Sequence, residues 1–400
     1  MIKKLSNHLS LFVIIIGAGS FFLSNLILKD VFNAYIYGQY SIIISYFSLI
    51  YVVGIFGADQ VFLRFSIARA PDVIETQRAQ FYLVPGILLV SSIIGTFVFR
   101  YNYPEIEINL FLFFFSSMGM IGILFLFSIL RLNSNFVFAQ FVSNYWKIVL
   151  FANAFLFYFY KSQVFDVFID IVLYNIILIF VLCLVYVYRK INFIFNLEYS
   201  LKDIVSTSFH FFLSILSAAL ILFSDRFIIE LKFDFEKFGN FFYLTNFFLA
   251  PYTILQNYIG FKQLIIFKNN FSLEYYRKFN SRTIFFGLAM GIILLVAGMI
   301  LSRFNIINFR FDDYVIIIVL LLITGTLRLF SSAINSAFEA RTSMIMLRKS
   351  NLYILIFTCS ILLFAIYVAN SVEIILICMI FIWISRCMIH TRLLFPKNKI

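Results

Sequence analysis

Charged residues are scarce in this 400-residue chain, at 12%, whereas hydrophobic residues make up 63%. A soluble domain usually carries about 25% charged residues, and it cannot hide this much apolar surface from water. The composition therefore excludes a soluble enzyme or a soluble nucleic-acid-binding domain, although the formal net charge is +12. The length is better counted in membrane spans of about 20 residues each.

Cysteine, histidine and tryptophan are also rare, with four, three and two residues. The cysteines all lie in apolar runs and none forms a CxxC pair, so neither a disulfide nor a metal site is expected. No GxxxxGK[ST], HExxH or GxSxG motif is present. These motifs are typical of phosphate-binding loops, zinc proteases and serine hydrolases. We therefore expect no cofactor, no metal and no catalytic residues in this chain.

What the chain does contain is a series of apolar runs separated by short polar or charged connectors. Because these runs are continuously apolar and do not alternate with a period of two, they predict helices rather than strands. The twelve runs cover residues 9–28, 40–62, 79–99, 108–130, 139–160, 167–188, 205–224, 241–261, 283–302, 314–336, 351–369 and 373–389.

The chain also repeats itself at half its length. The segment Tyr37–Tyr40 opens one apolar run, and the similar segment Phe238–Phe241 opens another, 201 positions later. The predicted fold class is an all-α polytopic membrane protein of about twelve transmembrane helices in two pseudo-symmetric six-helix lobes. We expect an N-terminal lobe at 1–188, a cytoplasmic linker at 189–204 and a C-terminal lobe at 205–400. Such repeats usually enclose a transport site near the bilayer midplane.

The distribution of lysine and arginine predicts the orientation. If the N-terminus is cytoplasmic, the cytoplasmic connectors carry more than twice as many Lys and Arg residues as the outer ones. This asymmetry favours cytoplasmic positions for both termini and an even number of spans.

Ionisable side chains within spans are costly to insert, so each one needs a reason. Two readings stay open for most of them: a cavity that binds cargo or ions, or an interfacial anchor whose side chain snorkels. Arg328 is the deepest and favours a cavity, whereas Arg386 near the last span's end is interpreted as an anchor. The candidate substrate-binding residues are Arg328, Arg64, Lys147, Lys262 and Arg226, and the candidate ion-coupling residues are Asp59 and Asp225.

Several short motifs give the chain a resemblance to a known family. They are Lys3-Lys4 before the first span, Tyr37-Gly38-Gln39-Tyr40, Gly57-Ala58-Asp59 with Arg64, Ser224-Asp225-Arg226-Phe227-Ile228-Ile229 and Phe238-Gly239-Asn240-Phe241. In this arrangement the chain resembles Wzx-type O-antigen and polysaccharide flippases of the multidrug/oligosaccharidyl-lipid/polysaccharide (MOP) exporter superfamily. Phe241 departs from the family pattern, which has tyrosine there.

The resemblance implies a protein of the bacterial inner membrane that flips an oligosaccharide linked to undecaprenyl diphosphate from the cytoplasmic to the periplasmic leaflet by alternating access. The cargo would be an O-antigen or capsule repeat unit. The partners implied are this lipid-linked oligosaccharide, the bilayer and a glycan polymerase, but no nucleic acid. Coupling to protons or sodium ions stays open. Arginine and lysine in a low-dielectric cavity suit a diphosphate head.

Two other functions remain open from the sequence. A drug or cation exporter of the related MATE type would need a cavity rich in acidic residues. A membrane-embedded glycan polymerase or acyltransferase is the other alternative. A polymerase usually carries a large periplasmic loop, which is absent here, and an acyltransferase needs a catalytic histidine, for which His210 is the only candidate.

Overall fold

The computed structural model describes residues 2–160, 164–196, 199–304 and 309–395. Within them, twelve long helices match the twelve predicted apolar runs, so the predicted fold class is confirmed. Six are α1 (Ile2–Val31), α2 (Ala34–Val53), α4 (Arg78–Asn102), α5 (Leu110–Leu132), α6 (Phe136–Tyr160) and α7 (Phe165–Lys190). The others are α8 (Leu201–Lys232), α9 (Phe235–Asn269), α10 (Leu273–Arg303), α11 (Val315–Arg341), α12 (Met344–Val368) and α13 (Val372–Leu394). Two short helices, α3 (Ala58–Phe65) and η1 (Phe311–Tyr314), accompany them.

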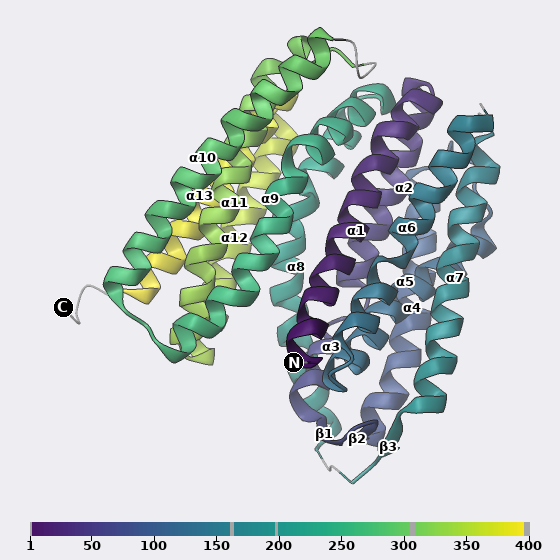
Figure 1. Ribbon diagram of the computed structural model, residues 1–400, viewed down its shortest axis with the longest axis vertical. Helices are drawn as coiled ribbons and strands as arrows, with labels where there is room; N and C mark the ends of the chain where they lie inside the picture. Colours follow the sequence, from purple (N-terminus) through teal and green to yellow (C-terminus); the bar gives the residue numbers. More distant parts are fainter. Residues whose placement is uncertain (1, 161–163, 197–198, 305–308, 396–400) are drawn as a thin grey trace. The chain divides into compact units, whose positions relative to one another are not determined.

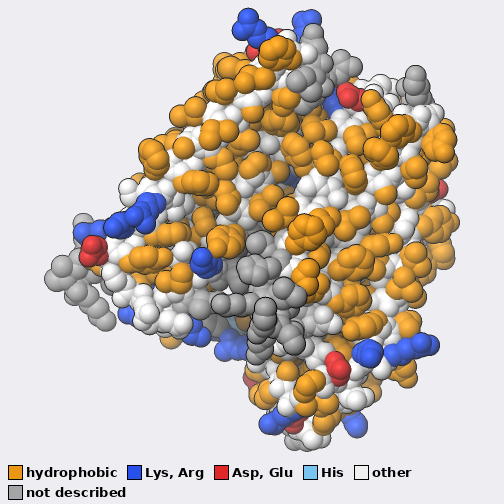
Figure 2. All heavy atoms as spheres, in the orientation of Figure 1, with side chains coloured by type: hydrophobic (Ala, Val, Ile, Leu, Met, Phe, Trp, Pro, Cys, Tyr) orange, Lys and Arg blue, Asp and Glu red, His pale blue; other side chains and the backbone are white. Residues whose placement is uncertain are grey.

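Ten helical segments of the described residues are long and apolar enough to cross a membrane, and the continuous segment of α2 and α3 counts as one of them. The helices α6 and α9 are of similar length but fall outside this set. Both carry polar side chains in their middle turns, including Asn144 and Lys147 in α6 and Thr245 and Asn246 in α9. Figure 2 shows hydrophobic side chains along the sides of the helices and most Lys and Arg side chains near helix ends. The chain is therefore a multi-pass membrane protein.

The chain divides into two compact units, Met1–Ala219 and Leu220–Ile400. In the first unit, α5 packs against α2, α3, α4, α6 and α7, and α1 packs along α6. In the second unit, α11 packs against α9, α10 and α13. Each unit is thus built around one central helix, and the boundary between the units falls within α8. The six-plus-six division at 189–204 stays a prediction.

The second predicted span is not one continuous helix. The chain breaks after α2 and restarts at α3, with left-handed backbone at Phe56 (φ 50°) and Gly57 (φ 73°). The continuous span expected over 40–62 is therefore wrong at this point. A residue other than glycine is strained in this region of φ/ψ space, and strained residues of this kind gather at functional sites. The freed carbonyl of Gly54 accepts a hydrogen bond from the Ser91 hydroxyl at 2.6 Å.

A small sheet covers one end of the first unit (Figure 1). Its strands are β1 (Ile67–Ala70), β2 (Val73–Glu75) and β3 (Asn192–Ile194), in the order β1-β2-β3. The pair β1–β2 is antiparallel, and β2–β3 is parallel with Ile74 opposite Phe193. Part of the predicted linker at 189–204 therefore pairs with the connector between α3 and α4. The sequence analysis did not predict this sheet.

The half-length repeat is visible as a repeated helical corner. Helices α1 and α8 end at Val31 and Lys232, and α2 and α9 begin at Ala34 and Phe235, so both boundaries are 201 positions apart. The N-cap residues Asn33 and Asp234 are also 201 apart. Asn33 accepts from the backbone N–H of Ile36 at 2.9 Å, and Asp234 accepts from that of Lys237 at 2.7 Å. A side-chain acceptor at this position satisfies a backbone donor that the helix itself cannot pair.

Candidate functional site

The second unit contains a buried ion pair between two of the predicted site residues. Asp225 on α8 is 1% exposed and Arg328 on α11 is 5% exposed. The guanidinium nitrogen Nη2 of Arg328 lies 3.9 Å from Oδ2 of Asp225, and Oδ1 accepts from the backbone N–H of Arg226 at 2.9 Å. Burying an isolated charge costs much free energy, and each of these two groups lowers that cost for the other.

A second arginine shares the surroundings of Arg328. The guanidinium carbons of Arg328 and Arg386 lie 5.6 and 5.5 Å from the ring centre of Trp383, which is fully buried. The Nε atoms of both arginines and the indole N–H donate no hydrogen bond in the described part of the chain. Among the described residues, Arg386 has no carboxylate within 4.0 Å.

The interpretation of Arg386 as an anchor stays a prediction, and the structure adds its contact with Trp383. Arg386 is half-buried in α13 and lies three residues after Trp383, so both side chains belong to one helix face. We call the set Asp225, Arg328, Trp383 and Arg386 the arginine cluster. It holds two positive charges against one negative charge, together with unused N–H donors. Such a set can bind an anion, because charge-assisted hydrogen bonds from arginine are the strongest that side chains make.

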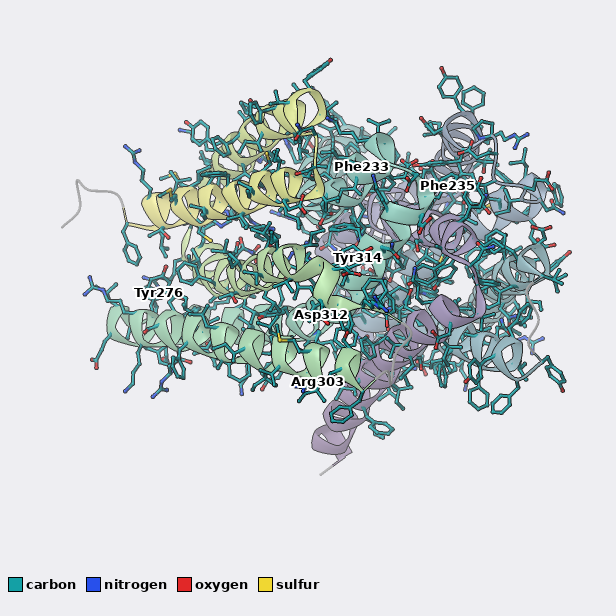
Figure 3. The ribbon with its side chains drawn as sticks, turned by 90° about the horizontal axis from the view of Figure 1, so that it is seen from above. Phe233, Phe235, Tyr276, Arg303, Asp312 and Tyr314 are labelled. Carbon is teal, nitrogen blue, oxygen red and sulfur yellow. The ribbon has the colours of Figure 1, made fainter. Side chains whose placement is uncertain are left out.

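Arg226 lies next to the arginine cluster in sequence but faces aromatic rings. Its guanidinium carbon is 5.1 Å from the ring centre of Phe242 and 5.8 Å from that of Phe223, and its side chain is half-buried. Contacts of this type stabilise a cation in a poorly hydrated setting. Figure 3 labels Phe233 and Phe235, which flank the corner between α8 and α9, and Tyr314 in η1. The Tyr314 hydroxyl accepts a hydrogen bond from Asn240 of α9 at 3.1 Å.

In the first unit, Asp59 lies just after the helix break. It is 2% exposed, and its Oδ2 accepts from the side-chain amide of Gln60 at 2.7 Å, while its Oδ1 has no partner among the described residues. Arg64, five residues further along α3, is exposed and forms no ion pair with Asp59. Asp59 is therefore a buried carboxylate with free acceptor capacity.

Lys147 occupies the interior side of α6. Its Nζ donates to Oδ1 of Asn144 at 3.0 Å and lies 5.8 Å from the ring centre of Trp146. A Cβ on Gly17 of α1 would stand 2.5 Å from that of Asn144, so α1 and α6 approach closely at this level. The lysine is half-buried and bound to a neutral partner. It supplies the first unit with a positive charge inside the bundle.

Lys262 differs from the other candidates because it is exposed on α9. Its Nζ donates to the hydroxyl of Tyr258 one turn earlier, at 3.0 Å. The helix runs unbroken through Pro251 to Asn269, so the eighth span continues past the predicted boundary at 261. The helix break described above therefore lies at Gly54–Gly57, whereas α9 is continuous at Pro251.

Acidic residues line one pocket of about 430 Å³ in the first unit. Its walls include Glu107, Asp166 and Asp170 together with Arg100. These residues belong to the last turn of α4, the segment before α5 and the first turns of α7. The pocket thus lies at helix ends rather than at mid-span. His210, the catalytic candidate of the enzyme alternative, is exposed on α8. His390 is buried, and its ring stacks on that of Phe338 with ring centres 4.6 Å apart.

The fold of this chain is similar to that of proteins with solved structures. No protein-family profile and no curated protein sequence matches the chain. Among solved structures, the chain is similar to the lipid II flippase MurJ in an inward closed conformation, with a TM-score of 0.57 and 14% identity over 97% of this chain and 85% of that chain. It is also similar to a MATE protein in complex with Br-NRF, with a TM-score of 0.46 and 12% identity over 96% of this chain and 93% of that chain. At such low identity, the likeness to MurJ shows a shared fold.

Proposed function

We propose that this chain is not an enzyme but a flippase, which moves an oligosaccharide linked to undecaprenyl diphosphate from the cytoplasmic to the periplasmic leaflet of a bacterial inner membrane. The cargo would be an O-antigen or capsule repeat unit, carried by alternating access, with both termini of the protein in the cytoplasm. A glycan polymerase that extends the flipped unit is the expected protein partner.

The observation that supports this proposal is the excess of positive charge in the arginine cluster. A diphosphate head is anionic, and it requires donors that are present before the cargo arrives. Arg328 and Arg386 provide such donors inside a helix bundle, and their charge exceeds that of Asp225. The fold shared with a lipid II flippase is consistent with a lipid-linked cargo.

The other candidates take supporting roles in the proposal. Arg226 and Lys147 add buried or half-buried positive charge in the second and first units. Arg64 and Lys262 are exposed and would act on the cargo at the protein surface. Asp59, with one free carboxylate oxygen, and Asp225 are the candidates for carrying a proton or a sodium ion.

The acidic pocket favours a second candidate, a cation exporter. Glu107, Asp166 and Asp170 could hold a cationic molecule, and only Arg100 opposes them. We rank this function second because the carboxylates lie at helix ends. A translocated cation also has to pass the interior of the spans, where basic residues outnumber acidic ones.

The test is surface-glycan display in the source bacterium after deletion of this gene, with plasmid-borne variants at equal abundance. The wild type should restore the glycan, and Arg328→Gln should not. Because Arg328→Gln leaves Asp225 unpaired and buried, the informative variant is the double substitution Asp225→Asn with Arg328→Gln, which removes both charges. Arg303→Gln, an exposed arginine of the same unit, is the matched control.

If the pair serves the cargo through Arg328 or the coupling ion through Asp225, the double variant folds yet displays no glycan. If the double variant restores the glycan, Arg328 serves only to neutralise Asp225. If deletion leaves the glycan unchanged and increases sensitivity to cationic drugs, the chain is a cation exporter.

A further inference from the structure

A second, mostly apolar cavity of about 260 Å³ lies in the first unit, next to the helix break that carries Asp59. Helices α3, α4 and the start of α8 form its walls. The lining includes Phe56, Val61, Gln80, Val84, Ile204 and Phe209. Apolar cavities smaller than this remain dry and take up apolar guests. The occupant therefore needs a hydrocarbon part.

The depth of this cavity matches one leaflet of a bilayer. It begins at the first turns of α4 and α8 and reaches Ile87, nine residues after Arg78. At about 1.5 Å per residue, this is roughly 13 Å along the helix axis. Val205 and Phe209 on its rim are 49% and 56% exposed, so the cavity has an open side with an apolar border. A lipid chain can enter from the membrane by that side.

The walls are held at this separation by specific contacts. The hydroxyl of Ser208 on α8 donates to the carbonyl of Phe56 at 2.6 Å. The ring of Phe56 stacks on Phe212 with centres 4.5 Å apart. Gly57 lets α8 approach, because a Cβ there would be 2.8 Å from the carbonyl oxygen of Ser208. The cavity is thus a built feature of the helix break and not a loose gap.

One polar group of the lining is unsatisfied. The side-chain oxygen of Gln80 accepts from the hydroxyls of Ser66 and Thr76 at 3.3 and 3.1 Å. This fixes the amide, yet its Nε2 has no partner among the described residues, and Gln80 is only 3% exposed. Buried donors without a partner are rare. The free N–H group suits an oxygen atom at the polar end of a lipid chain.

Three basic residues stand close in sequence to lining residues at the same end. Arg64 follows Val61 by three residues, Arg78 precedes Gln80 by two and Lys202 precedes Ile204 by two. The guanidinium carbon of Arg78 lies 5.9 Å from the ring centre of Phe195. All three are exposed, and none takes part in an ion pair in the part of the chain that the structure describes. Two nearby acids are engaged, since Glu75 pairs with Arg69 and Asp203 accepts from Ser200 at 2.6 Å. Asp59 is buried and keeps one oxygen without a partner among the described residues.

We propose that this cavity binds one anionic phospholipid of the surrounding membrane, with an acyl chain between α4 and α8 and the phosphate at Arg64, Arg78 and Lys202. Basic pockets beside transmembrane helices select anionic head groups in general. The occupant would stabilise the contact between α8 and the helix break. This inference does not depend on which cargo the protein moves.

The test is native mass spectrometry of the full-length protein in detergent, titrated with phosphatidylglycerol or phosphatidylcholine of identical acyl chains. We expect tighter retention of phosphatidylglycerol. Val84→Phe, which fills the cavity, should reduce retention at least about tenfold, since a steric block opposes every contact of the chain. Val98→Phe, at a 40% exposed position of the same helix, is the matched control and should retain the lipid.

If Val84→Phe does not fold, a second variant that changes only surface residues keeps the test valid. Arg64→Gln combined with Arg78→Gln should weaken the binding of phosphatidylglycerol by roughly 25-fold, at about fivefold for each basic residue, and leave the binding of phosphatidylcholine unchanged. Equal retention of the two phospholipids by the wild type would overturn the proposal. So would tighter retention of a polyprenyl phosphate, because the cavity would then belong to the cargo carrier.

Discussion

Gly57→Ala is expected to destabilise the first unit at the junction between α3 and α8. The φ of 73° at Gly57 costs an L-residue about 1–2 kcal/mol. The new Cβ would also stand 2.8 Å from Cβ of Phe211 and 2.9 Å from the backbone nitrogen of Phe212. Since two of the three nearest atoms belong to the backbone of α8, relief requires movement of that helix, and overpacking of this kind costs about 1–3 kcal/mol. The expected loss is therefore about 2–5 kcal/mol in total.

The assay is thermal unfolding of the purified protein, followed as the fraction that remains monodisperse on size exclusion after heating. Gly86→Ala in α4 is the matched control, because no atom lies within 4 Å of the position its Cβ would take. Alanine is a better helix former than glycine by about 1 kcal/mol, so this control should unfold at an equal or higher temperature. Equal midpoints for Gly57→Ala and the wild type would refute the close approach of α8 to the helix break.

Two further predictions concern the second unit and the repeated corner. Asp225→Asn or Arg328→Met alone should destabilise the protein by about 3–5 kcal/mol, and the double variant by less than the sum, measured as a double-mutant cycle of unfolding free energies. Additive losses would contradict the ion pair. Asn33→Ala and Asp234→Ala should each cost about 1 kcal/mol because both remove an N-cap acceptor, and unequal midpoints of unfolding would contradict the equivalence of the two corners.

Most of the helical architecture could be predicted from the sequence. A continuous apolar run of about 20 residues inside a membrane has to pair its backbone hydrogen-bonding groups within itself, and it therefore forms a helix. The corners were also visible in the repeat, since Asn33 and Asp234 stand at equal offsets before Tyr37 and Phe238. The break after α2 has a signal in Gly54 and Gly57, but such glycines are also common on packing faces, so the pattern alone could not separate the two readings.

The small sheet could not be predicted, because its strands have three or four residues and β3 comes from a segment more than a hundred residues away. Short strands of this kind depend on their pairing partner more than on their own composition. The same applies to the cavity lined by Gln80, whose walls come from three separate helices.

The candidate site was predictable only where the depth of a charge in its span is informative. Arg328 lies near the middle of α11, so its burial followed from position. Arg386 lies near the end of the predicted span at 373–389, where snorkelling gives an adequate account. The structure extends α13 to Leu394 and shows that Arg386 and Arg328 both contact Trp383. When two side chains meet in space but lie far apart in the sequence, a single sequence shows no pattern that connects them.

The two halves keep the same corner but differ in the chemistry they place before it. Asp225 and Arg226 of α8 correspond, at the offset of 201, to Ser24 and Asn25 of α1. Ser24 donates to the carbonyl of Ser20 at 2.6 Å, and the amide of Asn25 donates to the carbonyl of Phe21 at 2.7 Å. Both donors are thus satisfied within α1, and the Asn25 oxygen accepts from the Tyr37 hydroxyl of α2 at 3.3 Å.

The carboxylate of Asp225, at the equivalent position of α8, instead forms an ion pair with Arg328 from α11. The repeat therefore preserves backbone geometry, whereas charge differs between the halves. In the first unit, Asp59 is a buried carboxylate at a different position, behind the helix break. The proposed function therefore gives the two halves different tasks, and it assigns anion recognition to the arginine cluster of the second unit.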